Sequence, residues 1–149
     1  MDVHDKKTRS YNMSKIKGKN TVIELIVRRF LFENGFRYRI HNKKIIGKPD
    51  IVIPKYRVII DVRGCYWHGH KNCKYGEKVI PGTELAKKRI MDAKIRDERN
   101  VIEWKKLGWN VVIVWGRCEL EDKKVNYSEK RQDRLNKLRE EILSCSVNR

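Results

Sequence analysis

Two neighbouring groups of residues in this chain have the types and the spacing that metal ions require. Asp50 and Asp61 bracket two short apolar stretches, and residues 64–73 follow with the sequence Gly-Cys-Tyr-Trp-His-Gly-His-Lys-Asn-Cys. Carboxylates are typical ligands of hard cations such as Mg²⁺, whereas Cys and His are typical ligands of Zn²⁺. A chain of net charge +17 that carries both groups is most simply a nuclease.

The two aspartates are expected to face each other across a β-hairpin. If residues 54–57 form a four-residue loop, residue 53 faces residue 58 and Asp50 faces Asp61, with Cβ atoms ~4.5–5.5 Å apart. Carboxylates ~5 Å apart repel by roughly 3 kcal/mol at an effective dielectric of 20, and bound Mg²⁺ would turn that repulsion into attraction. Arg63 shares their face. A second interpretation is therefore a solvated hairpin whose acids are neutralised by Arg63 and neighbouring lysines.

Three further titratable residues could belong to the same site. Asp97 interrupts the apolar face of a long predicted helix, where an acid needs a metal ion, a buried salt bridge or an N–H group that donates to its carboxylate. His68 could deprotonate an attacking water, because histidine titrates near neutrality, or it could bind zinc instead. Glu24 completes a capping box with Thr21, yet it also lies in line with apolar residues of its helix, so it could point inward.

A second metal site is predicted from cysteine and histidine. The candidate ligands are Cys65, His70, Cys73 and Cys118. A Cys₃His set suits a closed, tetrahedral, structural Zn²⁺, which would fix an irregular loop that has little apolar area of its own. The alternative is a group of small, buried cysteines without metal. Cys145 lies in the C-terminal segment and is expected to take no part.

The elements that must position these residues alternate between helices and strands. We expect helices at residues 22–34 and 84–107, ended by Gly35 and Gly108, and a last helix capped by Ser128. We expect strands at residues 36–41, 50–53, 58–62 and 110–115, a turn at 45–49, and burial of the nearly all-apolar last strand. The last helix should bury three apolar residues, namely Leu135, Leu138 and Ile142.

Length and charge suggest how the chain is organised. The sequence predicts a basic arm at residues 1–20, which contacts DNA, and a single domain at residues 21–149. The chain has 36 Lys and Arg residues against 19 Asp and Glu, so binding to a polyanion should weaken steeply with salt. No apolar run approaches the ~18 residues of a membrane span, and residues 1–5 lack a signal peptide's apolar segment. We expect a cytosolic protein in contact with the nucleoid and not with a membrane.

Several segments resemble the very-short-patch repair (Vsr) DNA mismatch endonucleases. In the N-terminal segment these are Asp2-Val3-His4, Arg9-Ser10, Met13, Ile16, Thr21 and Glu24. Further along they are residues 47–50 (Gly-Lys-Pro-Asp), 64–68 (Gly-Cys-Tyr-Trp-His), 107–109 (Leu-Gly-Trp) and 111–115. The resemblance implies an α/β, restriction-endonuclease-like fold, in which helices flank a mixed central sheet, with a structural zinc site. It also implies Mg²⁺-dependent nicking of one strand of double-stranded DNA, 5′ to the thymine of a T·G mismatch.

The resemblance also implies roles for individual residues. Asp50 would be the central Mg²⁺ ligand and His68 the general base, while Glu24 and Asp97 would hold metal-bound waters or support His68. Cys65, His70, Cys73 and Cys118 would bind zinc. Tyr66 and Trp67 match an aromatic pair that wedges into the base stack. In the arm, the candidate DNA contacts are Arg9, Met13, Lys15 and Lys17. A monomer fits an asymmetric nick.

The chain departs from the repair family in one triplet, in one pair of residues, and in two insertions of one residue each, between His70 and Cys73 and between Trp115 and Cys118. Asp61-Val62-Arg63 is closer to the general PD-(D/E)xK nuclease motif, with Arg63 in the lysine position and the Val62 carbonyl as a candidate Mg²⁺ ligand. Leu85-Ala86 stands where the family carries an aromatic wedge. Two alternatives therefore stay open: a Vsr-like, homing-type endonuclease that cuts matched DNA, and a zinc-stapled DNA-binding module without catalysis.

Overall fold

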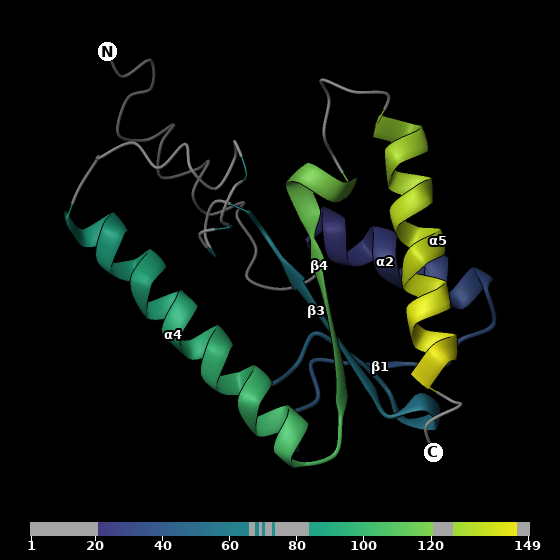
Figure 1. Ribbon diagram of the computed structural model, residues 1–149, viewed down its shortest axis with the longest axis horizontal. Helices are drawn as coiled ribbons and strands as arrows, with labels where there is room; N and C mark the ends of the chain where they lie inside the picture. Colours follow the sequence, from purple (N-terminus) through teal and green to yellow (C-terminus); the bar gives the residue numbers. More distant parts are fainter. Residues whose placement is uncertain are drawn as a thin grey trace, which may run out of the picture.

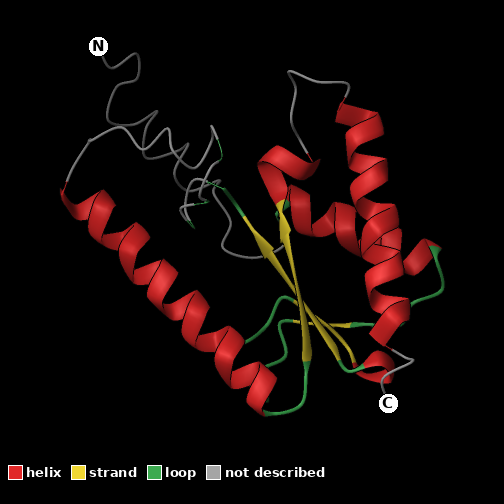
Figure 2. Ribbon diagram, in the orientation of Figure 1, coloured by secondary structure: helices red, strands yellow, loops and turns green. Residues whose placement is uncertain are grey.

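A four-stranded mixed β-sheet with helices on both faces forms the centre of the molecule in a computed structural model (Figures 1 and 2). The structure describes residues 21–65, 68, 70, 73, 84–120 and 127–145. The helices are α2 (Val22–Glu33), α4 (Glu84–Lys106) and α5 (Tyr127–Cys145), and the strands are β1 (Arg39–Ile40), β2 (Ile51–Ile53), β3 (Val58–Arg63) and β4 (Asn110–Trp115). Two short helical turns are η1 (Pro54–Tyr56) and η2 (Gly116–Leu120). The predicted α/β class, with helices flanking a mixed sheet, is confirmed.

The strands lie in the order β1-β2-β3-β4. β1, β2 and β3 pair antiparallel, whereas β4 pairs parallel to β3. Parallel neighbours need a crossover connection, and α4 provides it. The β2–β3 register pairs Ile51 with Ile60 and Ile53 with Val58, as predicted, and the loop between them contains η1.

Each face of the sheet packs on a different set of helices. α2 and α5 cover one face, where the larger hydrophobic core lies, and α4 covers the other, where Trp104 packs on Val52 and Ile59 (Figure 1). All three apolar residues predicted for the buried stripe of α5, Leu135, Leu138 and Ile142, are buried in the larger core. Alternation along β3 therefore sends Ile59, Asp61 and Arg63 toward α4 and Ile60 and Val62 toward α2 and α5.

The helix ends follow from local chemistry. Thr21 caps α2, because its side chain accepts a hydrogen bond from the backbone N–H of Glu24. Gly35 and Gly108 follow α2 and α4 with φ of +82° and +89°, which only glycine adopts without steric cost. α5 begins at Tyr127, one residue before the Ser128 that was predicted to precede and cap it.

Two strand predictions need correction. Residues 36–41 were expected to form a strand, but only Arg39 and Ile40 pair with β2, because the buried Phe36 packs into the core instead of the ladder. β4 was expected to be buried throughout, yet only Val112 and Val114 are, because β4 lies at the edge of the described sheet. The predicted arm, residues 1–20, lies outside the described residues. In the described part of the chain, no helix combines the length and apolar character needed to cross a bilayer.

Candidate active site and cysteine–histidine cluster

A cleft of about 770 Å³ lies between the start of α2, the turn at residues 47–50, the end of β3 and the middle of α4. It brings together residues that are far apart in the sequence. Among its lining residues are six that the sequence singled out, namely Glu24, Asp50, Asp61, Val62, His68 and Asp97. The cleft also contains Lys48, Arg96 and Asn100, which the sequence analysis did not single out.

Asp50 and Asp61 are neighbours in this cleft. The β2–β3 register, continued by one pair beyond Ile51 and Ile60, places the two aspartates opposite each other. The backbone N–H of Val62 donates a 3.1 Å hydrogen bond to Oδ2 of Asp50. Burial, followed by the negative charges of Asp61 and Glu24, raises the pKa of Asp50 to about 7, although the Val62 N–H opposes the shift. Crowded, partly buried carboxylates of this kind favour a bound cation or a bound proton.

Arg63 contacts Asp61 and does not line the cleft. Its Nε donates a 2.9 Å hydrogen bond to Oδ2 of Asp61, and its guanidinium lies 5.6 Å from the ring centroid of Trp115. One of its terminal nitrogens is buried without a hydrogen-bond partner among the described residues. In this arrangement Arg63 reaches the cleft only through its hydrogen bond to Asp61, among the contacts of the described residues.

His68 and Asp97 form a hydrogen-bonded pair. The two side chains approach to 2.6 Å between Nδ1 of His68 and Oδ2 of Asp97. Asp97 lies on the buried face of α4 with Ile90 and Trp104, as the apolar stripe predicted. Because a carboxylate accepts the proton on Nδ1, the other ring nitrogen, Nε2, is left as a proton acceptor. The other oxygen of Asp97, Oδ1, lies 3.9 Å from a guanidinium nitrogen of Arg96. The described residues therefore pair Asp97 by an ion pair and a hydrogen bond, which is the alternative to a metal ion that the sequence left open.

Glu24 points inward from the first turn of α2. Its Oε2 accepts a 3.0 Å hydrogen bond from Arg28 and lies 3.3 Å from Nε2 of His41. Thr21 accepts from the backbone N–H of Glu24, so the helix keeps a side-chain cap while the carboxylate turns to the cleft. Sequence reasoning missed His41. Counting cross-strand pairs one strand further would have found it, because the β1–β2 register places residue 41 opposite Asp50.

The turn before Asp50 contacts α4 closely at two points. The indole N–H of Trp104 donates a 2.7 Å hydrogen bond to the carbonyl of Ile46. A Cβ at Gly47 would lie 2.7 Å from Cγ of Asn100, so only glycine allows this approach. Lys48 has a φ of +47°, which is unusual for a residue with a side chain, and it lines the cleft. The turn therefore presents a lysine beside the carboxylates.

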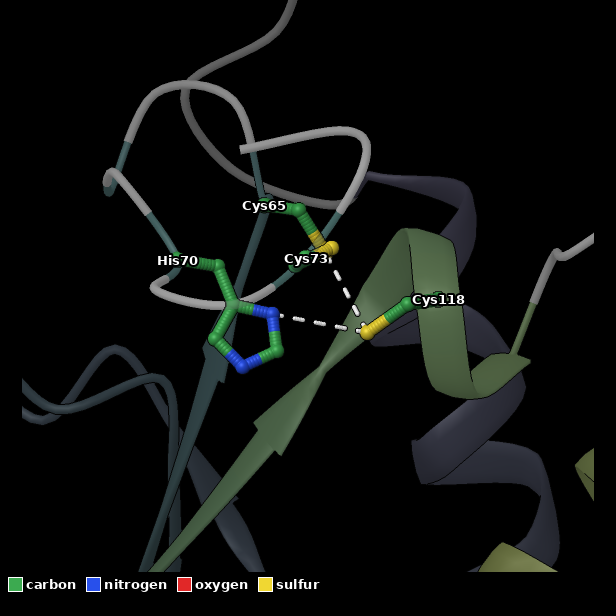
Figure 3. Close-up of side chains that lie close together, drawn as sticks. All are labelled: Cys65, His70, Cys73 and Cys118. Atoms are coloured by element: carbon green, nitrogen blue, oxygen red, sulfur yellow. Dashed lines mark hydrogen bonds between the residues drawn. The ribbon is translucent and has the colours of Figure 1, made fainter. Parts of the chain in front are cut away.

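The four predicted zinc ligands lie together at the end of the sheet (Figure 3). One ligand atom from each of Cys65, His70, Cys73 and Cys118 lies within 4.8 Å of the others. Sγ of Cys118 is 3.6 Å from Sγ of Cys65 and 3.4 Å from Nδ1 of His70. Metal–sulfur bonds of ~2.3 Å in a tetrahedron put sulfur atoms about 3.8 Å apart, so the donors fit one ion.

Charge also favours an ion in this cluster. Burial, and then the neighbouring thiols of Cys65 and Cys73, raise the pKa of Cys118, and burial lowers the pKa of His70. In the absence of metal, both shifts favour the neutral thiol and the neutral imidazole. A bound cation would instead stabilise the thiolates. Cys145 lies apart on α5, where its thiol donates to the carbonyl of Glu141. It does not belong to the cluster, as predicted.

Packing fixes two of the four donors. The imidazole of His70 stacks on the indole of Trp115 at 3.8 Å, with only 8° between the rings. Cys118 is carried by η2, which is a π-helical turn, and Glu119 in the same turn accepts from the backbone N–H of Trp115 at 3.1 Å. Arg134 of α5 forms an ion pair with Glu119 and donates to the carbonyl of Ile113 at 3.2 Å.

Six predicted DNA contacts, Arg9, Met13, Lys15, Lys17, Tyr66 and Trp67, lie outside the described residues. The remaining candidates form two groups near the end of β3. One is a cleft of carboxylates with a histidine, suited to hydrolysis with a hard cation. The other is a sulfur-rich cluster suited to a structural ion.

Comparison with known proteins identifies the family of this chain. The profile of the family described as DNA mismatch endonuclease Vsr matches residues 1–74. The type II nicking enzyme V.NmeAIP of Neisseria meningitidis serogroup A is 40% identical over 141 residues, which cover 95% of this chain and 96% of that protein. The DNA mismatch endonuclease Vsr of Escherichia coli K12 is 36% identical over 134 residues, which cover 90% of this chain and 85% of that protein. This chain therefore belongs to the Vsr family of DNA endonucleases.

Proposed function

We propose that this chain is a Mg²⁺-dependent endonuclease that nicks one strand of duplex DNA at a T·G mismatch. The observation that carries the proposal is the cleft in which Asp50 faces Asp61 beside the His68–Asp97 pair. The relatives named as nicking enzymes and as a mismatch endonuclease support the choice of substrate. The substrate would be chromosomal DNA, so the enzyme would work at the nucleoid, and a monomer suits a single nick.

The carboxylates of Asp50 and Asp61, with the carbonyl of Val62, would hold Mg²⁺. When bound, the ion would polarise the scissile phosphate and stabilise the leaving oxygen. Asp97 fixes the proton of His68 on Nδ1, so that Nε2 accepts a proton from the attacking water. Arg63 would hold Asp61 in position. Glu24, whose carboxylate turns to the cleft, would orient water there by accepting a hydrogen bond.

The cysteine–histidine cluster would hold a structural Zn²⁺. Residues 63–65 join it directly to the end of β3, so the ion would fix the strand end that carries Asp61. We also propose that the sheet and its flanking helices form a restriction-endonuclease-like fold, because that fold belongs to the family that the chain resembles.

DNA would lie over the cleft. Lys48 and Arg96 line it beside the carboxylates and would contact phosphates on either side of the cut. By their match to the family, Tyr66 and Trp67 would wedge into the base stack. The arm would add phosphate contacts from Arg9, Lys15 and Lys17, and Met13 would wedge into the DNA. The net charge of +17 supports strong, salt-sensitive binding.

A strand-specific nicking assay tests the proposal. Duplexes labelled on either strand, with T·G or T·A at one position, are incubated with Mg²⁺ or without divalent ion. We expect one labelled product from the T·G duplex, only with Mg²⁺, and none from the Asp50→Ala variant, which should still bind DNA. Asp133→Ala, which changes an exposed acid on α5, is the matched control and should cleave normally. Cleavage by Asp50→Ala at the normal rate would refute the assignment.

A second candidate function is nicking of fully matched DNA at a specific site. It is favoured by Leu85, which is 57% exposed at the start of α4, where the family carries an aromatic wedge. An aromatic wedge opens the base stack most easily at a mismatched pair. Without that wedge, the binding energy of the enzyme would depend less on whether a mismatch is present. The ratio of the rates on T·G and T·A duplexes of one sequence decides between the two: a ratio near one selects the matched substrate.

A further inference from the structure

Trp115 contacts groups from both candidate sites, although it belongs to neither the cleft lining nor the ligand set of the cluster. It is the last residue of β4, and the parallel register pairs it with Arg63, the last residue of β3. The imidazole of His70 stacks on its indole, with ring centroids 3.8 Å apart. The guanidinium of Arg63 lies over the same indole, 5.6 Å from the ring centroid. One aromatic ring therefore contacts both a candidate ligand of the cluster and the arginine that bonds to Asp61.

The guanidinium of Arg63 has few polar contacts. Its Nε donates a 2.9 Å hydrogen bond to Oδ2 of Asp61, whereas one of its terminal nitrogens is buried with no hydrogen-bond partner among the described residues. The side chains of Arg63 and Asp61 are only 11% and 13% exposed, so water does little to hold either of them. A cation over an aromatic ring is attracted by the negative face of the ring, and more strongly where water is excluded. The indole of Trp115 therefore supplies support that hydrogen bonds do not.

We propose that Trp115 is a positioning residue of the active site, which couples the cysteine–histidine cluster to Asp61 through the guanidinium of Arg63. The hydrogen bond from Arg63 fixes the rotation of the Asp61 carboxylate. A carboxylate that is already oriented loses less conformational freedom when it binds a cation, so it binds that cation more tightly. The inference rests on the proposed function in one respect, because Asp61 is a ligand of Mg²⁺ only under that proposal.

The state of the cluster should reach Trp115 by two routes. Nδ1 of His70 lies 3.4 Å from Sγ of Cys118, so an ion held by both residues would keep the imidazole in place against the indole (Figure 3). Cys118 lies in η2, which follows β4 directly, so the same ion would also fix the strand end that carries Trp115. Loss of the ion would loosen both contacts, and the guanidinium of Arg63 would be held less firmly.

Two substitutions of Trp115 test the coupling through the Mg²⁺ dependence of nicking. In Trp115→Leu we expect the half-saturating Mg²⁺ concentration to rise roughly 3- to 30-fold, the range for loss of a cation–π contact, with little change in the rate at saturating Mg²⁺. Trp115→Phe keeps an aromatic face and should retain most of the Mg²⁺ affinity. Trp109→Leu is the matched control, because Trp109 lies just before β4 and carries the guanidinium of Arg57 at 4.1 Å from its ring centroid. A loss of stability alone would lower the melting temperature of both leucine variants without changing the Mg²⁺ dependence of either.

A second measurement does not depend on catalysis. The Nε–H of Arg63 gives a nuclear magnetic resonance signal, which Arg63→Lys identifies by losing it, and the hydrogen bond to Asp61 slows exchange of this proton with water. In zinc-loaded protein without DNA or Mg²⁺, we expect slow exchange in the wild type and roughly 3- to 30-fold faster exchange in Trp115→Leu. Wild-type protein whose cluster has been stripped by a chelator, kept well below its melting temperature, should also exchange faster. It supplies the same comparison without a substitution.

The outcomes separate this inference from the proposed function. Equal exchange rates in loaded and stripped wild type, or in the wild type and Trp115→Leu, overturn the coupling whether or not the chain nicks DNA. If the wild type nicks and Trp115→Leu has an unchanged half-saturating Mg²⁺ concentration, the inference fails and the nuclease stands. A wild type that does not nick with Mg²⁺ refutes the proposed function, while the exchange rates still decide whether the cluster acts on Arg63 through Trp115.

Discussion

Nδ1 of His68 and Oδ2 of Asp97 lie 2.6 Å apart, and this hydrogen bond joins a loop residue to the buried face of α4. The carboxylate fixes both the orientation of the imidazole and the nitrogen that carries its proton. If His68 is the general base, its activity depends on this bond, because the accepting nitrogen must be Nε2.

Asp97→Asn should therefore lower the single-turnover nicking rate by about 10²–10⁴-fold, the usual range for loss of a general base, with little change in DNA affinity. The amide can donate to Nδ1 and so favour the wrong tautomer. Glu98→Gln, an exposed change on the same helix, is the control and should nick normally. An Asp97→Asn enzyme with an unchanged rate would show that His68 works without this partner.

Asp50 should make the metal-free protein less stable as the pH rises. Its pKa is raised to about 7, chiefly by burial, from 3.8, so between these values the folded chain keeps a proton that the unfolded chain has released. The free energy of unfolding then falls as the pH rises through this window. Denaturant titrations of zinc-loaded, Mg²⁺-free protein should show this fall in the wild type, and Asp50→Asn should lack it.

The pKa of Asp50 should also govern how the nicking rate depends on the Mg²⁺ concentration. Because the cation needs an ionised Asp50, the half-saturating Mg²⁺ concentration for nicking should rise as the pH drops below about 7. Nicking rates measured against Mg²⁺ concentration at several pH values check this. A half-saturating concentration that stays constant from pH 6 to pH 8 would contradict a role for Asp50 as the ligand.

Most of the site could be predicted from short-range patterns. The aspartate pair follows from loop length and strand period, and Asp97 follows from its place in an apolar helical stripe. His41 was missed because its strand is only two residues long and ends in a left-handed residue, a conformation that the sequence pattern did not show. Lys48 and Arg96 were missed because a lysine or arginine in such a basic chain is distinguished only by where the fold places it.

Removal of the metal from the cysteine–histidine cluster should destabilise the fold. Cys118→Ser weakens a site whose ion can contribute ~10 kcal/mol or more to folding. A loss of about 3 kcal/mol would lower the melting temperature by about 6–12 °C. Cys145→Ser is the matched control, because Cys145 lies outside the cluster, and it should change the melting temperature little. A zinc chelator should lower the melting temperature of the wild type, and it should have a smaller effect on Cys118→Ser.

Lys48 should contribute one phosphate contact. Lys48→Gln is expected to weaken binding to all duplexes alike and to reduce the slope of log affinity against log salt by about one. Lys55→Gln is the comparison, because Lys55 lies in η1 at the other end of β2. Fluorescence anisotropy over a range of salt concentrations measures the affinity and its salt dependence for both variants. Equal slopes for Lys48→Gln and the wild type would place the DNA away from this side of the cleft.

The π-helical turn that carries Cys118 should depend on close contact with α2. A Cβ at Gly116 would clash with Cδ1 of Ile23, the residue next to Glu24, so η2 and the start of α2 meet at this glycine. Gly116→Ala must push them apart, and we expect a loss of about 1–3 kcal/mol with weaker metal retention by the cluster. The Cβ that Gly64→Ala adds meets nothing within 4 Å, so this variant should be nearly as stable as the wild type.

If crowding is the cause, Ile23→Ala combined with Gly116→Ala should recover part of the lost stability, measured as a positive coupling in a double-mutant cycle. Strictly additive losses would mean that Gly116 is needed for its backbone conformation and not for this contact.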